Sequence, residues 1–173
     1  IAEETPHILT VNNVRDRAVT PNTILVNSQF NFERASGTFA SQDIGAPAVA
    51  GSVSTVAGGY NITAGGTNIV GAADQFTFNY QQVVGDFDLK VRVAGLTLAD
   101  AWSKAGLMAR EALLANSRYA GSFATPSISG AYGQWRTNAG GATINGGSYL
   151  VNYPNTWLRL KRAGNLFTSF ASV

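Results

Sequence analysis

The sequence predicts an all-β protein built as an antiparallel β-sandwich of the jelly-roll type, and three observations favour this fold class. Apolar and polar residues alternate with period two along several short segments, which is typical of half-buried antiparallel strands. Glycine-rich turns separate these segments, and the chain of 173 residues holds 19 glycines without a collagen period. No segment reads as a strong helix, and only 111–116 is expected to form even a short helical turn.

The first part of the chain is predicted to be separate from the rest. Two strands are expected over 8–14 and 24–32, and a pair of strands alone is only marginally stable in water. A linker is expected over 33–42, and a second domain over 43–173. The predicted domain boundaries are therefore 1–32, 33–42 and 43–173.

Alternation is clearest between residues 74 and 93. Phe76, Phe78 and Tyr80 alternate with polar residues, and after a turn a second alternating run extends over 87–93. The glycines at 58 and 59 indicate a hairpin between two shorter strands. The other strands are predicted over 53–56, 60–64, 102–111, 119–124, 131–137, 157–162 and 166–171.

The composition excludes several classes of function. The 12 basic and 10 acidic residues are scattered along the chain, so a nucleic-acid partner is not expected. Without cysteine there are no disulfides, thiolate metal sites or cysteine nucleophiles. His7 is the only histidine, which excludes histidine-dependent triads and histidine-based zinc sites. No apolar run reaches the length of a membrane span.

Several sequence phrases occur in one order between residues 43 and 173. They are Asp43-Ile44-Gly45, Gly71-Ala72-Ala73-Asp74-Gln75-Phe76, Gly85-Asp86-Phe87, Trp102-Ser103-Lys104-Ala105-Gly106-Leu107-Met108-Ala109-Arg110-Glu111, Gln134-Trp135-Arg136 and Trp157-Leu158-Arg159-Leu160-Lys161-Arg162-Ala163-Gly164-Asn165. Together they resemble the concanavalin A-like lectin/glucanase superfamily, in the version appended to bacterial secreted hydrolases and surface proteins and related to the β-xylosidase C-terminal module.

The resemblance implies a secreted or cell-surface bacterial protein with further closing strands after Val173, which either follow in a longer chain or come from a neighbouring chain. A shorter phrase near the start is similar to the closing hairpin of a bacterial immunoglobulin-like module. It consists of Val14, Asp16, Pro21, Asn22 and Thr23. This second resemblance implies that residues 1–32 are the tail of such a module in a multidomain protein.

One face of the predicted strand 102–111 is the candidate ligand surface. Its odd positions are mostly small or apolar, whereas its even positions are aromatic, basic or thioether-bearing. Aromatic rings stack on sugars, and basic and amide side chains donate hydrogen bonds to them. The predicted ligand-binding residues are Trp102, Lys104, Met108, Arg110, Gln134 and Arg136. The alternative is that these residues are structural, while Trp135 and Trp157 are expected in the core.

Carboxylates offer two further hypotheses. Asp86 and Asp88 are the nearest analogue of a glycosidase pair, but Lys90 and Arg92 share the strand face of Asp88 and would keep it ionised. A structural calcium ion, held by Asp74 and Asn68, is a second hypothesis, and turn capping by Asp74 is its alternative.

These observations favour a non-catalytic, lectin-like carbohydrate-binding module with a polysaccharide or glycan as its partner. The alternative is a structural or adhesive surface protein whose sandwich mediates assembly with neighbouring domains or with copies of itself. A glycan hydrolase is a third hypothesis.

Overall fold

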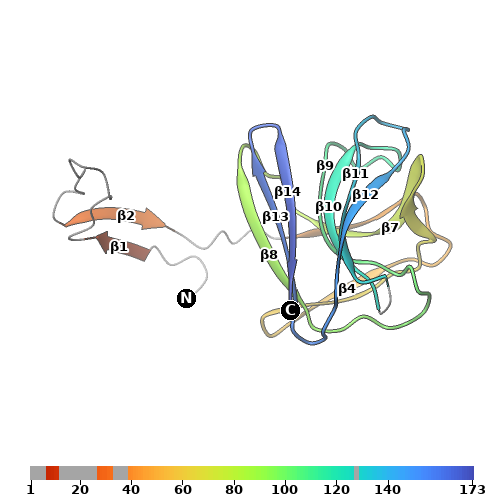
Figure 1. Cartoon of the computed structure of the whole chain (residues 1–173), viewed down its shortest axis with the longest axis horizontal. Coiled ribbons are helices and arrows are strands. Elements are labelled where there is room, and N and C mark those ends of the chain that lie inside the picture. The colour runs from red at the N-terminus through yellow and green to blue at the C-terminus, as the bar shows by residue number, and fades with distance from the viewer. Residues whose placement is uncertain (1–6, 12–26, 33–38, 127–128) are drawn as a thin grey trace. The chain divides into compact units, whose positions relative to one another are not determined.

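The computed structural model describes residues 7–11, 27–32, 39–126 and 129–173. The chain divides into two compact units, Ile1–Thr38 and Phe39–Val173. All regular elements of the described residues are strands in antiparallel pairs, with no helix among them (Figure 1), which confirms the all-β fold class. Within those same residues, no helix is long and apolar enough to span a membrane.

The described residues of the first unit form one antiparallel pair of strands. β1 (His7–Val11) pairs with β2 (Ser28–Phe32), so that His7 lies opposite Phe32. Both strands overlap the segments predicted for them. The phrase that resembles an immunoglobulin-like module, Val14 to Thr23, lies outside the described residues.

The described residues of the second unit contain the other strands, which form four sheets. Their orders are β12-β11-β10-β9, β14-β13-β8, β3-β7-β6 and β4-β5. The strands are β3 (Ala40–Ile44), β4 (Ser52–Val56), β5 (Gly59–Thr63), β6 (Asn68–Val70), β7 (Ala73–Tyr80), β8 (Phe87–Val93), β9 (Ala105–Arg110), β10 (Tyr119–Ala124), β11 (Ala131–Arg136), β12 (Ile144–Tyr149), β13 (Thr156–Ala163) and β14 (Leu166–Ser172).

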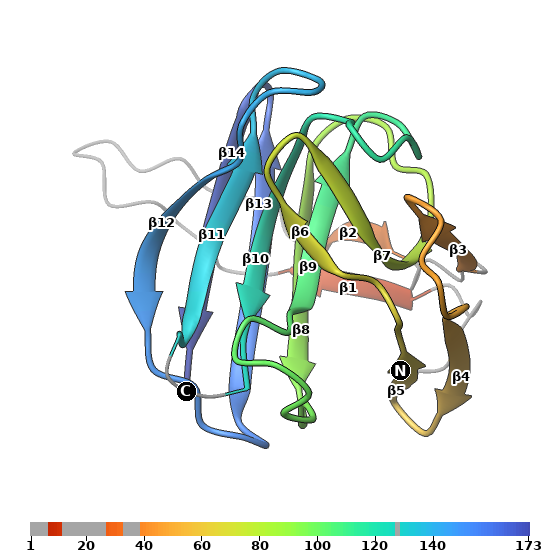
Figure 2. The ribbon, with the colours of Figure 1, turned by 90° about the vertical axis from the view of Figure 1, so that its right-hand side faces the viewer.

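The four-stranded sheet lies between two other layers of the second unit. On one side it packs against β8, β13 and β14, and on the other side it faces β6 and β7 (Figures 1 and 2). Ser122 Oγ on β10 donates a hydrogen bond of 3.1 Å to the carbonyl of Phe170 on β14. On the opposite side, Gln134 Nε2 on β11 donates one of 2.8 Å to the carbonyl of Ile69. The arrangement is therefore sandwich-like, with a further layer over the middle sheet.

Two hydrophobic cores follow from this layering. The first core lies between the four-stranded sheet and β8-β13-β14, and its buried residues are Val93, Ala124, Ala131 and Leu158. The second core lies under β6 and β7, and contains Ile69, Tyr119 and Phe123, with Phe76 and Met108 packed against them. Because consecutive side chains of a strand point to opposite faces of its sheet, those of β9, β10 and β11 point alternately into the first and the second core.

The strand predictions agree with the structure for most segments of the second unit. β9 is shorter than predicted, because Asp100 Oδ1 accepts a 2.7 Å hydrogen bond from Trp102 N and holds that residue in a turn. Three strands were not predicted, namely β3, β6 and β12. β3 begins inside the predicted linker, and β12 contains the Gly146-Gly147 pair, which has no side chains to show an alternation.

Candidate functional site

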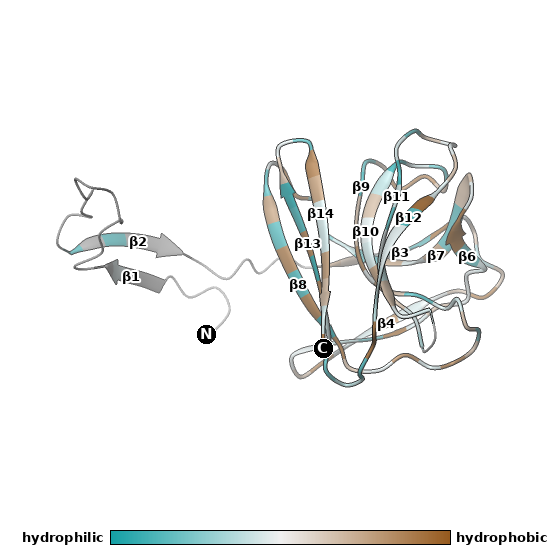
Figure 3. Ribbon diagram, viewed as in Figure 1, coloured by the Kyte–Doolittle hydropathy of each residue, from teal (hydrophilic) through white to brown (hydrophobic). Residues whose placement is uncertain are grey.

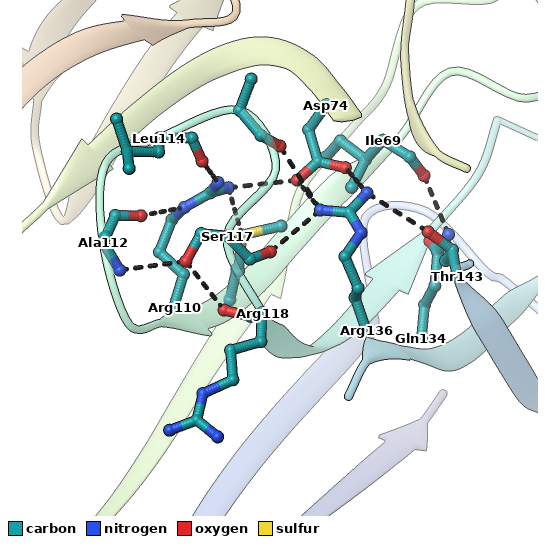
Figure 4. Close-up of polar contacts among 12 residues, drawn as sticks. Ile69, Asp74, Arg110, Ala112, Leu114, Ser117, Arg118, Gln134, Arg136 and Thr143 are labelled. Carbon is teal, nitrogen blue, oxygen red and sulfur yellow. Dashed lines mark hydrogen bonds and ion pairs between the residues drawn. The ribbon is translucent and has the colours of Figure 1, made fainter. Parts of the chain in front are cut away.

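Four of the predicted ligand-binding residues lie in the second core, around one buried ion pair (Figure 4). The side chains of Asp74 and Arg136 are both completely buried. Arg136 Nη2 lies 2.6 Å from Asp74 Oδ1, and Arg136 Nη1 lies 2.9 Å from Oδ2. Arg110 Nη1 approaches the same Oδ2 at 3.4 Å. Both carboxylate oxygens of Asp74 therefore bind guanidinium groups of the protein itself.

The remaining guanidinium donors are also bonded within the protein. Arg136 donates to the carbonyls of Gly71 and Ser117, each at 2.9 Å. Arg110 Nε donates to the carbonyl of Ala112 at 2.8 Å. Burial lowers the pKa of Arg110, and the adjacent carboxylate of Asp74 opposes that shift. This cluster joins β7, β9, β11 and the 111–118 segment, so its evident role is structural.

Gln134 and Met108 complete the four predicted residues at the second core, whereas Lys104 and Trp102 lie before the start of β9. Gln134 is 3% exposed, and Met108 packs against the second core. Lys104 Nζ donates to Asn68 Oδ1 at 2.5 Å and to the carbonyl of Trp102 at 3.1 Å. Trp102 is 55% exposed in the turn before β9. Ligand binding by these residues stays a prediction, and within the set Trp102 stands apart as a large exposed side chain.

The predicted calcium ligands are already engaged by cations. Asp74 is held by two arginines, and Asn68 Oδ1 accepts hydrogen bonds from Lys104 Nζ and from the backbone N of Ile69. No group of three or more acidic, histidine or cysteine residues suited to a metal occurs in the described part of the chain. These residues do not fit a calcium ion, because the positive charges beside them would repel it.

A different surface combines aromatic and basic side chains in the open. It is the outer face of the sheet β14-β13-β8, opposite the first core. Side chains point alternately to the two faces of the sheet along β13. Leu158 and Leu160, each only 1% exposed, point inward, and the residues between and beside them point to this outer face. We call it the basic–aromatic face, and its residues are Asp88, Lys90, Arg92, Trp157, Arg159, Lys161, Thr168, Phe170 and Ser172.

Strand register arranges the basic–aromatic face in three rows. The rows are Arg92, Trp157, Ser172; then Lys90, Arg159, Phe170; then Asp88, Lys161, Thr168. Hydrophilic and hydrophobic residues alternate along β8 (Figure 3), as expected of a strand with one face on the core. Residues more than 60 positions apart in the sequence thus become direct neighbours on one surface.

The aromatic rings of this face are open to solvent. Trp157 is 47% exposed and Phe170 is 42% exposed. The guanidinium of Arg159 lies over the Phe170 ring, 4.9 Å from its centre. A shallow depression of about 400 Å³ lies here, and its lining residues are Lys90, Trp157, Leu158, Arg159, Phe170, Ala171 and Ser172.

The face is strongly basic for this chain. Residues 39–173 contain nine lysines and arginines and six acids, and four of these bases lie on the face with one acid, Asp88. Arg159 Nε donates to Asp88 Oδ1 at 2.7 Å, and the hydrogen bond from Arg159 is the main cause that lowers the pKa of Asp88. Lys90, Arg92 and Lys161 make no side-chain hydrogen bond or ion pair with any residue that the structure describes.

Sequence reasoning missed this surface because its strands are distant in the chain. Trp157 was expected in the core, since it begins an apolar strand, but it points to the outer face. The alternation of Lys90 with Arg92, and of Arg159 with Lys161, was a usable signal. These basic residues form one surface only when β8 pairs with β13, and no residue pattern in the sequence predicts that pairing.

Comparison of the chain with protein-family models, with curated proteins and with solved structures found no match. The functional assignment therefore depends on the geometry and chemistry of the surface.

Proposed function

We propose that residues 39–173 form a non-catalytic carbohydrate-binding module, which binds a glycan on the basic–aromatic face. The observation that carries this proposal is the exposed pair Trp157 and Phe170 on one sheet face, with the Arg159 guanidinium stacked on the Phe170 ring. Aromatic faces stack on the apolar faces of sugar rings, and guanidinium and ammonium groups donate hydrogen bonds to sugar hydroxyls. Asp88 holds Arg159 in place, which reduces the entropy that binding would cost.

The sequence resemblance supports the same proposal. A concanavalin A-like jelly roll of a secreted or cell-surface bacterial protein would be a sandwich without helices, and the described residues are compatible with that fold. In this proposal the first unit is the tail of an immunoglobulin-like module. The module would then serve to hold a larger protein on a polysaccharide.

The chemistry of the two candidate carboxylates favours binding over hydrolysis. A glycosidase needs one carboxylic acid that is protonated at working pH. Asp86 Oδ1 accepts a 2.7 Å hydrogen bond from the backbone N of Gly164 at the β13–β14 turn. The hydrogen bond from Arg159 lowers the pKa of Asp88, the opposite of what a general acid requires.

Two tryptophan variants test the location of binding. In a glycan array and in polysaccharide pull-downs, we expect Trp157→Ala to abolish binding and Trp102→Ala to leave it unchanged. Both tryptophans are about half exposed, so Trp102→Ala is a matched control. The opposite result would place binding at the turn before β9, and binding indifferent to both substitutions would refute a tryptophan-dependent site.

Assembly into larger particles is a second candidate function, and a specific surface favours it. β12 is an end strand of its sheet, so that one backbone edge is unpaired within that sheet. Ile144 and Tyr149 on this strand are about half exposed, and Leu150 after it is 85% exposed. Light scattering over a range of concentrations tests this function. Oligomers that Ile144→Lys dissociates would support it, whereas a monomer at high concentration would contradict it.

A further inference from the structure

We infer that the glycan recognised by the basic–aromatic face is an acidic polysaccharide, whose carboxylate groups pair with Lys90, Arg92 and Lys161. This inference rests on the proposed function, because it concerns the ligand of the same face. It adds a chemical class of ligand and a role for three side chains that sugar stacking alone does not use.

The first support is the charge balance of the face. Four bases and one acid lie on it, and the acid is already paired with Arg159. Lys90, Arg92 and Lys161 therefore make no ion pair of their own among the described residues, and the one nearby acid, Asp88, holds its hydrogen bonds with Arg159. All three are exposed, so an arriving anion can reach them without displacing a protein group. A neutral polysaccharide would leave these charges unused.

The second support is where the charges lie relative to the rings. Arg92 is directly opposite Trp157 in strand register, and Lys90 is directly opposite Arg159. Neighbouring strands are separated by roughly 4.8 Å, so a ring stacked on Trp157 would carry its substituents within reach of the β8 cations. Lys161 lies two residues beyond Arg159, on the same side of β13. The face thus has several cations spaced along it beside exposed aromatic rings, an arrangement that suits a polymer with repeated acidic sugars.

The third support distinguishes acidic sugars from nucleic acid. Asp88 lies beside Lys161 on the face and is exposed, with a pKa held below its usual value. A carboxylate at this position accepts hydrogen bonds from sugar hydroxyls, which a polysaccharide carries on every residue and a DNA backbone lacks. Thr168 and Ser172, which are also on the face, add hydroxyl groups that donate and accept. Four bases form a smaller basic patch than nucleic-acid recognition typically uses.

Matched polymers test the inference. Polygalacturonate, alginate and hyaluronan would each be compared with their methyl esters, which keep the sugar backbone but remove the charge. We expect at least one acid form to bind roughly tenfold more tightly than its ester in dilute buffer, a size consistent with a few exposed ion pairs. This preference should disappear in about 0.5 M salt, where exposed charges are screened.

Substitutions on the basic–aromatic face test whether its cations cause the preference for the acid form over the ester. Replacing Lys90, Arg92 and Lys161 together by glutamine should reduce binding of the acid form to that of the ester. Arg92→Gln alone should have a partial effect, and Arg118→Gln is its matched control, because Arg118 is exposed on a different segment and pairs with Glu111. Circular dichroism and thermal melting confirm that each variant is folded.

The outcomes separate this inference from the proposed function. Equal binding of acid and ester forms, lost with Trp157→Ala, would overturn the acidic specificity and leave carbohydrate binding intact. Absence of binding to every polymer, acidic or neutral, would overturn both. Tighter binding of a single-stranded oligothymidylate than of any acidic polysaccharide would overturn the inference in favour of nucleic acid. Acid binding that survives the triple glutamine variant would place the anion site elsewhere.

Discussion

Asp74 on β7 and Arg136 on β11 face each other inside the second core, joined by two parallel hydrogen bonds of 2.6 and 2.9 Å. The pair links β7 to the four-stranded sheet at a point that water does not reach. A buried ion pair adds little net stability when both partners are present, but removal of one partner leaves the other charged and unsolvated. Arg110 increases this effect, because it shares the same carboxylate.

Asp74→Asn should therefore destabilise the protein strongly. The substitution keeps the size of the side chain but leaves Arg136 and Arg110 without a counter-charge, and we expect a loss of about 3–5 kcal/mol in the free energy of unfolding. Urea unfolding followed by circular dichroism measures it. Asp88→Asn, which breaks an exposed pair with Arg159, is the control and should cost much less. Equal losses in the two variants would contradict the structural role of the buried pair.

Gly106 on β9 should not tolerate a side chain. A Cβ at this position would overlap the backbone of Ser122 and come within 2.9 Å of Phe123 Cα, both on β10. Gly106→Ala should therefore push two paired strands apart, with a cost of about 1–3 kcal/mol. Gly95→Ala is the matched control, because a Cβ there meets nothing within 4 Å. A thermal shift no larger than that of Gly95→Ala would show that the strands can separate without penalty.

The buried tyrosines should make the fold sensitive to alkali. Burial raises the pKa of Tyr119 and that of Tyr132 to about 12. An unfolded chain ionises its tyrosines near pH 10, so their contribution to stability is complete below about pH 10 and is lost as the pH rises towards 12. Ultraviolet difference titration should show Tyr119 and Tyr132 among the last tyrosines to ionise, together with unfolding.

Tyr119→Phe refines the same prediction. The buried hydroxyl of Tyr119 makes no hydrogen bond of normal geometry, and the Thr143 side chain only partly opposes the rise of its pKa, so its removal should change stability little. The late titration should then lose one tyrosine. A clear loss of stability would show that the hydroxyl is bonded in solution.

Local alternation was sufficient to predict most of the second unit, because it records which side of a strand meets a core. It failed where that signal is weak. β6 has only three residues, and β12 contains two glycines with no side chain to alternate. The strand predicted over 102–111 was too long at its start because the side chain of Asp100 bonds the backbone of Trp102, a local interaction that hydrophobic periodicity does not record.

The candidate site was harder to predict, for a different physical reason. Arg110 and Arg136 do share one face of the middle sheet, as their alternation indicated, but β6 and β7 cover that face and Asp74 pairs with both arginines. From sequence alone, a polar face that meets another layer is indistinguishable from one that meets solvent. The basic–aromatic face depends on the pairing of β8 with β13, a long-range contact that local pattern does not encode.

The pair of Asp88 and Arg159 offers a direct measurement on that face. The hydrogen bond from Arg159 lowers the pKa of Asp88, with further help from the charges of Arg159, Lys90 and Lys161. Its contribution to stability is therefore present above the pKa of an unfolded aspartate, near 4, and is lost as the pH falls through the lower folded value. Carboxyl titration by NMR should show Asp88 ionising below its ordinary value of 3.8.

Arg159→Gln should raise the pKa of Asp88 towards its ordinary value, because the charged donor is removed while the neighbouring lysines remain. Glu111 is an internal control, since its pKa is lowered by a hydrogen bond from Arg118 on another segment and should not change. If Asp88 kept its low pKa in this variant, Lys90 and Lys161 would be sufficient to hold the carboxylate ionised. They would then be partly neutralised by Asp88 and less available to an acidic ligand, and the acidic specificity of the face would be weaker than its charges indicate.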